Sequence, residues 1–206
     1  MFPFKKKSLP LLGVDISATA VKLLELTRNG NSYRVESYAA EALPTNSVVD
    51  KNIAEIEQVG EVIARALKKS GSKIKTAAAA VAGSSVITKV IEMPVDLTDS
   101  EMESQIQIEA DQYIPFPLEE VALDFEVIGI NENNPDRVDV MLAASRVDNV
   151  EGRVGAMELG GLTTKVVDIE AFALENAVKM IVEQQLGEGE GKVIAVADIG
   201  SFITTF

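Results

Sequence analysis

Residues 11–26 read LLGVDISATAVKLLEL, two apolar runs separated by an aspartate and a few small and hydroxyl residues. The apolar runs predict the strands of a β-hairpin, and DISAT, residues 15–19, predicts its turn. The simpler interpretation is a structural hairpin with a polar turn. The alternative is a phosphate-binding hairpin, because small residues let backbone N–H groups approach a phosphate and hydroxyl groups add donors.

A second stretch near the C-terminus favours the alternative. Residues 196–204 read VADIGSFIT, in which an apolar run again ends in Asp-Ile, a small residue and hydroxyl residues. One such motif has little specificity. Two of them indicate a pair of phosphate-binding hairpins, in which Asp15 and Asp198 would hold Mg²⁺, usually through its waters.

Composition predicts a soluble globular protein. The chain has 206 residues, of which 47% are hydrophobic, enough for one large domain or two small ones. No apolar run approaches the roughly 20 residues that span a bilayer, and no signal peptide precedes the domain. We therefore expect a cytoplasmic protein, and the absence of cysteine agrees with a reducing compartment.

The missing residue types restrict the chemistry. Without His or Cys, the chain has no Ser/His/Asp triad, no Cys nucleophile and none of the usual zinc ligand sets. Carboxylates and hydroxyls remain, and these suit Mg²⁺. The net charge of −13 argues against a nucleic-acid partner. The basic run Lys5–Lys7 is better explained as a solvated tail than as a membrane contact.

The first 83 residues predict the order β-β-β-α-β. Residues 32–43 alternate as a third strand after a turn at Gly30 and Asn31. An apolar stripe then predicts a helix that ends at Gly71, and TAAAAVAG, residues 76–83, predicts a small-residue strand. The stripe consists of Ile53, Ile56, Val59, Ile63 and Leu67.

The middle of the chain predicts shorter elements. Residues 86–93 form a strand, and Thr98 with Glu101 forms a capping box that begins a helix ending before Pro115. Residues 121–144 alternate as an antiparallel hairpin with one solvated face. Phe116, between two prolines, lies in an exposed turn, and we favour a local core role for its side chain over a partner-binding role.

The last third predicts helix, strand, helix and strand. The helix around Val150–Met157 ends at Gly160 and Gly161, residues 163–169 form a strand, and a long helix follows up to a GEGEG loop at residues 187–191. Residues 193–199 predict a strand buried on both faces of a central sheet. A buried strand is a poor C-terminus, so we expect a truncated chain.

These motifs resemble those of a known superfold. DISATAVK and DIGSFITTF resemble the phosphate-1 and phosphate-2 motifs of the actin, Hsp70 and sugar kinase superfold. Over nearly its whole length the chain resembles the type IV pilus assembly protein PilM family, which is related to the cell-division protein FtsA. The stretches that carry this resemblance are LLGVDISATAVKLLEL, EADQYIPFPLEEV, DVMLAASR and GLTTKVVDIEAFAL.

The resemblance implies an α/β fold, the first half of an actin-like ATPase fold with an inserted FtsA-type α+β subdomain. Residues 1–83 and 162–190 would form the actin-like subdomain 1A, and residues 84–161 the inserted subdomain 1C. Residues 191–206 would begin the second actin-like half.

The resemblance also implies an ATP and Mg²⁺ site. Asp15 and Asp198 would lie near the metal ion. Lys22 would contact a phosphate, or it would be a surface residue. Glu170 would orient a water molecule as in hydrolytic relatives, or, as we favour, it would stabilise a helix N-terminus. The phosphate-lining residues would be Ser17, Ala18, Thr19, Gly200, Ser201 and Thr204. Ser17 stands where many members have Gly, and the adenosine-binding motif would lie beyond Phe206, so we expect this chain to bind ATP weakly or not at all.

The implied function is a scaffold with little or no ATPase turnover and no catalytic residue. Such proteins lie at the inner membrane, associate with it through partners, bind the cytoplasmic N-terminus of PilN, and have the pilus motor ATPases as further candidate partners. The resemblance implies a partner-binding groove between the first subdomain and the insertion, with residues 81–89 and 143–146 as candidate walls, although subdomain packing is the commoner role of such residues. The alternatives are an ATP-hydrolysing or polymerising protein of the FtsA or actin type and, without support in the sequence, a sugar or acetate kinase.

Overall fold

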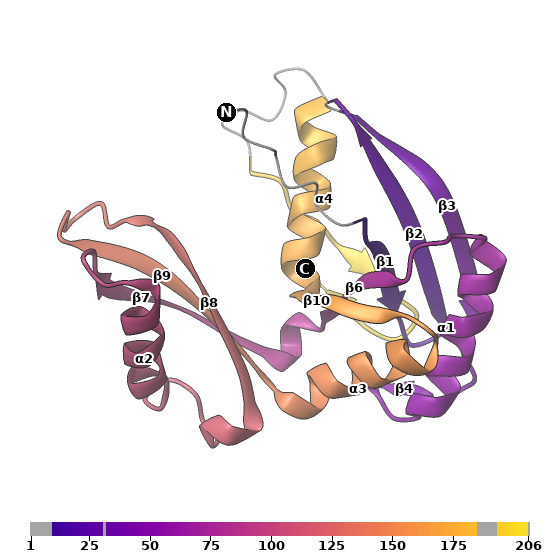
Figure 1. The fold of residues 1–206 in the computed structure, drawn as a ribbon, viewed down its shortest axis with the longest axis horizontal. Helices are drawn as coiled ribbons and strands as arrows, with labels where there is room; N and C mark the ends of the chain where they lie inside the picture. Colours follow the sequence, from indigo (N-terminus) through magenta and orange to yellow (C-terminus); the bar gives the residue numbers. More distant parts are fainter. Residues whose placement is uncertain (1–9, 31, 185–192, 206) are drawn as a thin grey trace, which may run out of the picture. The chain divides into compact units, whose positions relative to one another are not determined.

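The computed structural model describes residues 10–30, 32–184 and 193–205, and the chain divides into two compact units (Figure 1). Unit 1 comprises Met1–Ala80 and Gly152–Phe206, and unit 2 comprises Val81–Glu151. Asn31, Lys5–Lys7 and the GEGEG loop lie outside the described residues. Within those residues no helix is both long and apolar enough to cross a membrane.

Unit 1 is built on a five-stranded sheet in the order β10-β6-β1-β2-β3. The strand β1 pairs antiparallel with β2 and parallel with β6, so the predicted β-β-β-α-β order is confirmed. The strands are β1 Leu12–Ile16, β2 Ala20–Asn29, β3 Ser32–Ala42, β6 Thr76–Val81 and β10 Thr163–Ile169. Two short strands, β4 Val48–Val49 and β5 Asn52–Ile53, form a separate hairpin that the sequence did not reveal.

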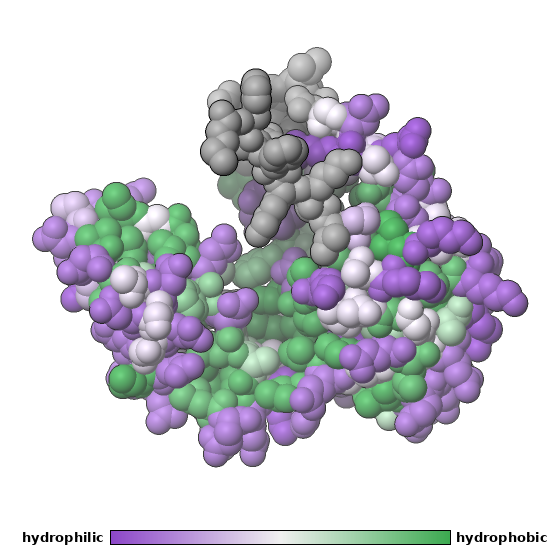
Figure 2. All heavy atoms as spheres, in the orientation of Figure 1, coloured by the Kyte–Doolittle hydropathy of each residue, from purple (hydrophilic) through white to green (hydrophobic). Residues whose placement is uncertain are grey.

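The helix α1, Ile56–Ser70, supplies much of the core of unit 1. Its predicted stripe is confirmed from Ile56 to Leu67, whereas Ile53 lies before the helix, in β5. Gly71 ends the helix in the left-handed conformation at φ 70°. Val59, Val62 and Ile63 are buried with Leu12 and Leu23 of the sheet. The remaining side of α1 carries charged residues, visible as hydrophilic surface in Figure 2.

The helix α3, Val147–Leu159, packs closely against α1. A Cβ at Gly160, directly after α3, would collide with the buried side chain of Ile63, and a Cβ at Gly60 would lie 2.6 Å from that of Leu159. Glycine at these positions therefore permits the close approach of two helical segments. The helix α4, Glu170–Gln184, follows β10 directly.

The observed boundary between the units differs from the expected insertion at 84–161. Unit 2 ends at Glu151, inside α3, and the later residues Ala156 and Met157 are fully buried in the core of unit 1. The helical period shows that these residues are buried, but it does not indicate in which core. The assignment of the units to actin-like subdomains stays a prediction.

Unit 2 is a three-stranded antiparallel sheet with one longer helix. The strands lie in the order β7-β9-β8, with β7 Val86–Pro94, β8 Val121–Ile130 and β9 Arg137–Arg146. The predicted hairpin is confirmed as β8 and β9, and the predicted capping box begins α2, Asp99–Ala110. Short 3-10 turns lie at Gly83–Ser85 and Leu118–Glu120. The core includes Met93, Met102, Ile106 and Val140.

Two predictions about burial are wrong. Residues 193–199 do not form a buried strand: only Asp198–Ile199, β11, is a strand, it pairs with β12, Thr204–Thr205, and Val193 is fully exposed. An apolar strand is buried only where layers cover both its faces, and this hairpin joins neither larger sheet of the described residues. Phe116 is exposed, because the turn that holds it carries it outside the cluster of Ala110, Ile114 and Ala144.

Candidate functional site

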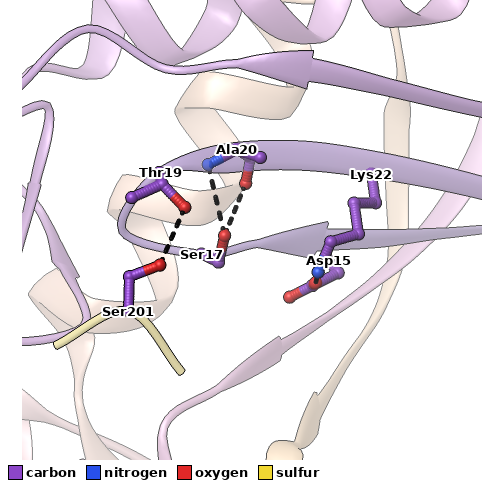
Figure 3. Close-up of polar contacts among 6 residues, drawn as sticks. All are labelled: Asp15, Ser17, Thr19, Ala20, Lys22 and Ser201. Carbon is purple, nitrogen blue, oxygen red and sulfur yellow. Dashed lines mark hydrogen bonds and ion pairs between the residues drawn. The ribbon is translucent and has the colours of Figure 1, made fainter. Parts of the chain in front are cut away.

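The turn of the first hairpin, between β1 and β2, is closed by Ser17. Its N–H donates to the carbonyl of Ala20 at 3.0 Å, and its hydroxyl donates to the same carbonyl at 2.9 Å (Figure 3). The hydroxyl also accepts from the N–H of Ala20 at 3.2 Å. Ser17 therefore stabilises the turn itself, and this explains how the hairpin accommodates serine.

Asp15 and Lys22 face each other across the first hairpin. They are register partners of β1 and β2, and Lys22 Nζ lies 2.8 Å from Asp15 Oδ2 (Figure 3). The hydrogen bond and the charge of Asp15 raise the pKa of Lys22, and the charge of Asp198 raises it further. The first hairpin therefore presents an ion pair, and the second aspartate lies within its electrostatic range.

The second hairpin, β11–β12, turns at Gly200 and Ser201. The N–H of Gly200 donates to the carbonyl of Ile203 at 3.1 Å, and a Cβ at Gly200 would lie 2.8 Å from that oxygen. A residue without a side chain is therefore required for this turn. Thr204, also predicted to line the phosphates, pairs with Ile199 in the ladder.

The two turns meet through their hydroxyl residues. Thr19 Oγ1 lies 3.4 Å from Ser201 Oγ, across 182 positions of sequence (Figure 3). Two turns with small and hydroxyl residues, and an aspartate beside each, match the donors that bind phosphate and water-ligated Mg²⁺. No group of three or more acidic side chains gathers as a metal site within the described residues. Asp15 and Asp198 stay candidate carboxylates on the sequence motif alone.

Glu170 and Lys51 lie beside the second hairpin, and the sequence predicted a role only for Glu170. Glu170 begins α4, and its Oε2 lies 2.7 Å from Lys51 Nζ. Lys51 also donates to Thr205 Oγ1 of β12 at 3.3 Å. The hairpin β4–β5, the start of α4 and the hairpin β11–β12 are thus joined by one lysine, Lys51.

Arg153 of α3 supports the backbone beneath this lysine. It is 3% exposed, its Nε donates to the carbonyl of Ala80 at 2.6 Å, and one terminal nitrogen donates to the carbonyl of Lys51 at 2.8 Å. Burial lowers the pKa of Arg153, and the charge of Glu170 opposes this effect. An arginine in EGRVG, between two glycines of one helix, was the only signal in the sequence.

The two candidate walls of the partner site lie in unit 2 as neighbours. Residues 86–88 pair with residues 143–145 in the β7–β9 ladder, and Ser145 Oγ donates to the carbonyl of Ser85 at 3.0 Å. At the end of β9, the guanidinium of Arg146 lies 5.9 Å from the ring centroid of Phe116. These stretches therefore form one continuous region of unit 2 with an exposed aromatic and a cation.

Comparisons with solved structures identify the fold. The chain matches a "PilM-PilN type IV pilus biogenesis complex" with a TM-score of 0.77 and 29% identity, over 93% of this chain and 55% of that chain. It thus spans about half the length of that relative. It also matches the cytoplasmic domain of EpsL, an inner membrane component of the type II secretion system of Vibrio cholerae, with a TM-score of 0.48 and 15% identity over 78% and 57% of the two chains.

The match to the pilus complex confirms the expected class, an α/β fold that corresponds to part of an actin-like protein. The family model of the type IV pilus assembly protein PilM matches residues 13–206, and the chain belongs to this family.

Proposed function

We propose that this chain is part of a type IV pilus biogenesis scaffold that binds the cytoplasmic N-terminus of a PilN protein. In the full-length protein MgATP is a structural or regulatory ligand, which this chain alone binds weakly or not at all. Two comparisons support the partner: the family, and the relative described as a PilM-PilN complex. The scaffold lies at the inner membrane through its partners, and the pilus motor ATPases are further candidate partners.

The main support for a phosphate-containing ligand is that the two hairpin turns meet, with Thr19 Oγ1 3.4 Å from Ser201 Oγ. A ligand with several phosphate groups could accept from both turns at once, and Asp15 and Asp198 would hold its Mg²⁺ through water. Binding would then favour one arrangement of the two hairpins, and a partner that prefers this arrangement would bind more tightly.

A regulatory role is favoured over turnover by the membership of the PilM family. Glu170, the acid that would orient water in a hydrolytic relative, is paired with Lys51 Nζ at 2.7 Å through Oε2 only. We therefore expect phosphate release from MgATP to stay at the background rate. Sustained release that is lost in Glu170→Gln would instead support an ATP-hydrolysing protein.

The partner proposal is tested by calorimetric titration with a peptide of the cytoplasmic N-terminus of PilN. Because the candidate region contains Arg146 beside Phe116, Arg146→Ala should weaken binding by about tenfold or more, the usual effect of losing a charged hydrogen bond. Arg137→Ala, at the opposite end of β9, is the matched control and should bind as the wild type does. Absence of peptide binding by the wild-type chain would discard the partner proposal.

A further inference from the structure

The turn that carries Lys51 has an unusual backbone. Asp50 and Lys51 connect β4 to β5, and both have positive φ angles, 49° and 63°, the signs of a type I′ turn. This conformation suits Asp50, because Asn, Asp and Gly adopt it most readily, but it is strained for Lys51. Such strain persists where the surroundings hold it, and here the buried Arg153 donates to the carbonyl of Lys51.

The ammonium group of Lys51 lies beside β12, where Thr205 is the ladder partner of Asp198. It contacts Glu170 at 2.7 Å and the hydroxyl of Thr205 at 3.3 Å. Thr205 belongs to the hairpin whose turn holds Ser201. Because the side chains of Lys51 and Glu170 are only 22% and 33% exposed, their charges are less screened than those of a fully exposed pair.

With a polyphosphate bound, the site would have an excess of negative charge that a further cation could balance. Asp15 and Asp198 are negative, and Lys22 is already paired with Asp15 at 2.8 Å. A polyphosphate brings several more negative charges, which Mg²⁺ neutralises only in part. Lysine is a common phosphate ligand, because its flexible stem places a compact charge on the phosphate oxygens.

We propose that Lys51 is a phosphate-binding residue of this site and that Glu170 competes with the phosphate for its ammonium group. This inference rests on the proposed nucleotide-binding function. On binding, Lys51 turns from the carboxylate to a phosphate oxygen. Glu170 is not left without stabilisation, because it lies at the N-terminus of α4, where the helix dipole favours a negative charge.

Competition predicts opposite effects for the two partners of the ion pair. Lys51→Met removes the ligand and should weaken phosphate binding, whereas Glu170→Gln removes the competitor and should strengthen it. A pair with a purely structural role would give losses in both variants or no change in either. The sign of the Glu170→Gln effect therefore separates the two roles.

The probe is magnesium tripolyphosphate, which needs no base-binding wall and can be used at millimolar concentration. We would titrate it into the chain and follow the backbone amide resonances of Thr19, Gly200 and Ser201. Lys51→Met should weaken binding by about tenfold, and Glu170→Gln should strengthen it by about threefold. Lys51→Arg keeps a cation and should retain affinity within about threefold, which covers the case in which Lys51→Met fails to fold.

A second lysine–glutamate pair of unit 1 provides the matched control. Lys69 and Glu41 are also 2.7 Å apart, between α1 and β3. Lys69→Met and Glu41→Gln should leave the affinity unchanged.

The outcomes separate this inference from the function on which it rests. If the three resonances of the wild type do not move, the nucleotide proposal fails and this inference fails with it. If they move equally in the wild type and in Lys51→Met, or if Glu170→Gln weakens binding as Lys51→Met does, the hairpin site stands and the role of Lys51 is refuted.

Discussion

The hairpins β1–β2 and β11–β12 have similar motifs in very different surroundings. The first lies inside a five-stranded sheet, where Leu12 and Leu23 are fully buried beneath α1. The second consists of two short strands outside that sheet, and its Ile199 is 79% exposed. A motif therefore defines the chemistry of a turn, while the layers around it define how firmly the turn is held.

The largest contrast is expected from truncating an apolar side chain in each hairpin. Leu23→Ala should lower the free energy of unfolding by about 2–5 kcal/mol, because it leaves a cavity in a closed core. Ile199→Ala should change it by less than about 0.5 kcal/mol, because the side chain is already in solvent. Urea denaturation measures both, and equal losses would show that the second hairpin is also part of the core.

The layer behind the first hairpin can be tested through two glycines. Gly160→Ala places a methyl group against the buried Ile63 and should destabilise the chain by about 1–3 kcal/mol. Gly155→Ala, within α3, meets only an ordinary contact of 3.6 Å with Ile56 and should be neutral or stabilise by about 0.5–1 kcal/mol, since alanine favours the helix. If both variants unfold at the wild-type urea midpoint, the close packing of α1 and α3 is refuted.

Exchanging the small residues of the two turns should produce unequal effects. Ser17→Gly removes hydrogen bonds to Ala20 and should cost about 1 kcal/mol in global unfolding. Gly200→Ser forces a Cβ toward the carbonyl of Ile203 and should disrupt β11–β12 while leaving global stability unchanged. Amide hydrogen exchange resolves the two cases, and a global loss in Gly200→Ser would contradict the difference between the hairpins.

The smallest effect concerns the pKa of Lys22, which Asp15 and, more weakly, Asp198 raise. A raised lysine pKa contributes stability that is present below the unfolded pKa and lost as the pH rises through the folded pKa, so the contribution disappears in the alkaline range above about 10.4. Because the pair is about half exposed, the contribution should stay below about 1 kcal/mol.

The effect of Asp198→Asn on the pKa of Lys22 reports how near the second hairpin lies to the first. The variant should lower the pKa of Lys22 slightly, and Asp15→Asn should lower it more, as followed by NMR titration of the lysine side chain. An unchanged pKa in Asp198→Asn would mean that the hairpins are farther apart in solution.

The elements that were predicted correctly are those whose sequence pattern depends only on neighbouring residues. The stripe of α1, the capping box at Thr98 and the β8–β9 hairpin follow from spacing alone. The prediction of a buried strand over residues 193–199 was wrong, because an apolar segment is buried only if other layers of the fold cover it.

The part of the candidate site that the sequence missed depends on tertiary packing. Strands of two residues, such as β4 and β5, are too short to show a periodic pattern, so the turn at Lys51 could not be predicted from the sequence. Nor does a single arginine in a helix reveal which carbonyl groups lie beneath it. The pairing of Asp15 with Lys22 became visible only with the register of β1 and β2.

The fork of Arg153 has a consequence for how this family can diverge. The guanidinium joins two chain segments, at Ala80 and Lys51, through two separate nitrogens, a geometry that lysine cannot reproduce. If the proposed site binds nucleotide, we expect that in lineages that lose this binding but keep the fold, Lys51 changes among polar residues while Arg153 stays arginine. Comparing substitution rates at these two positions would distinguish descendants that still respond to nucleotide from those that retain only the architecture.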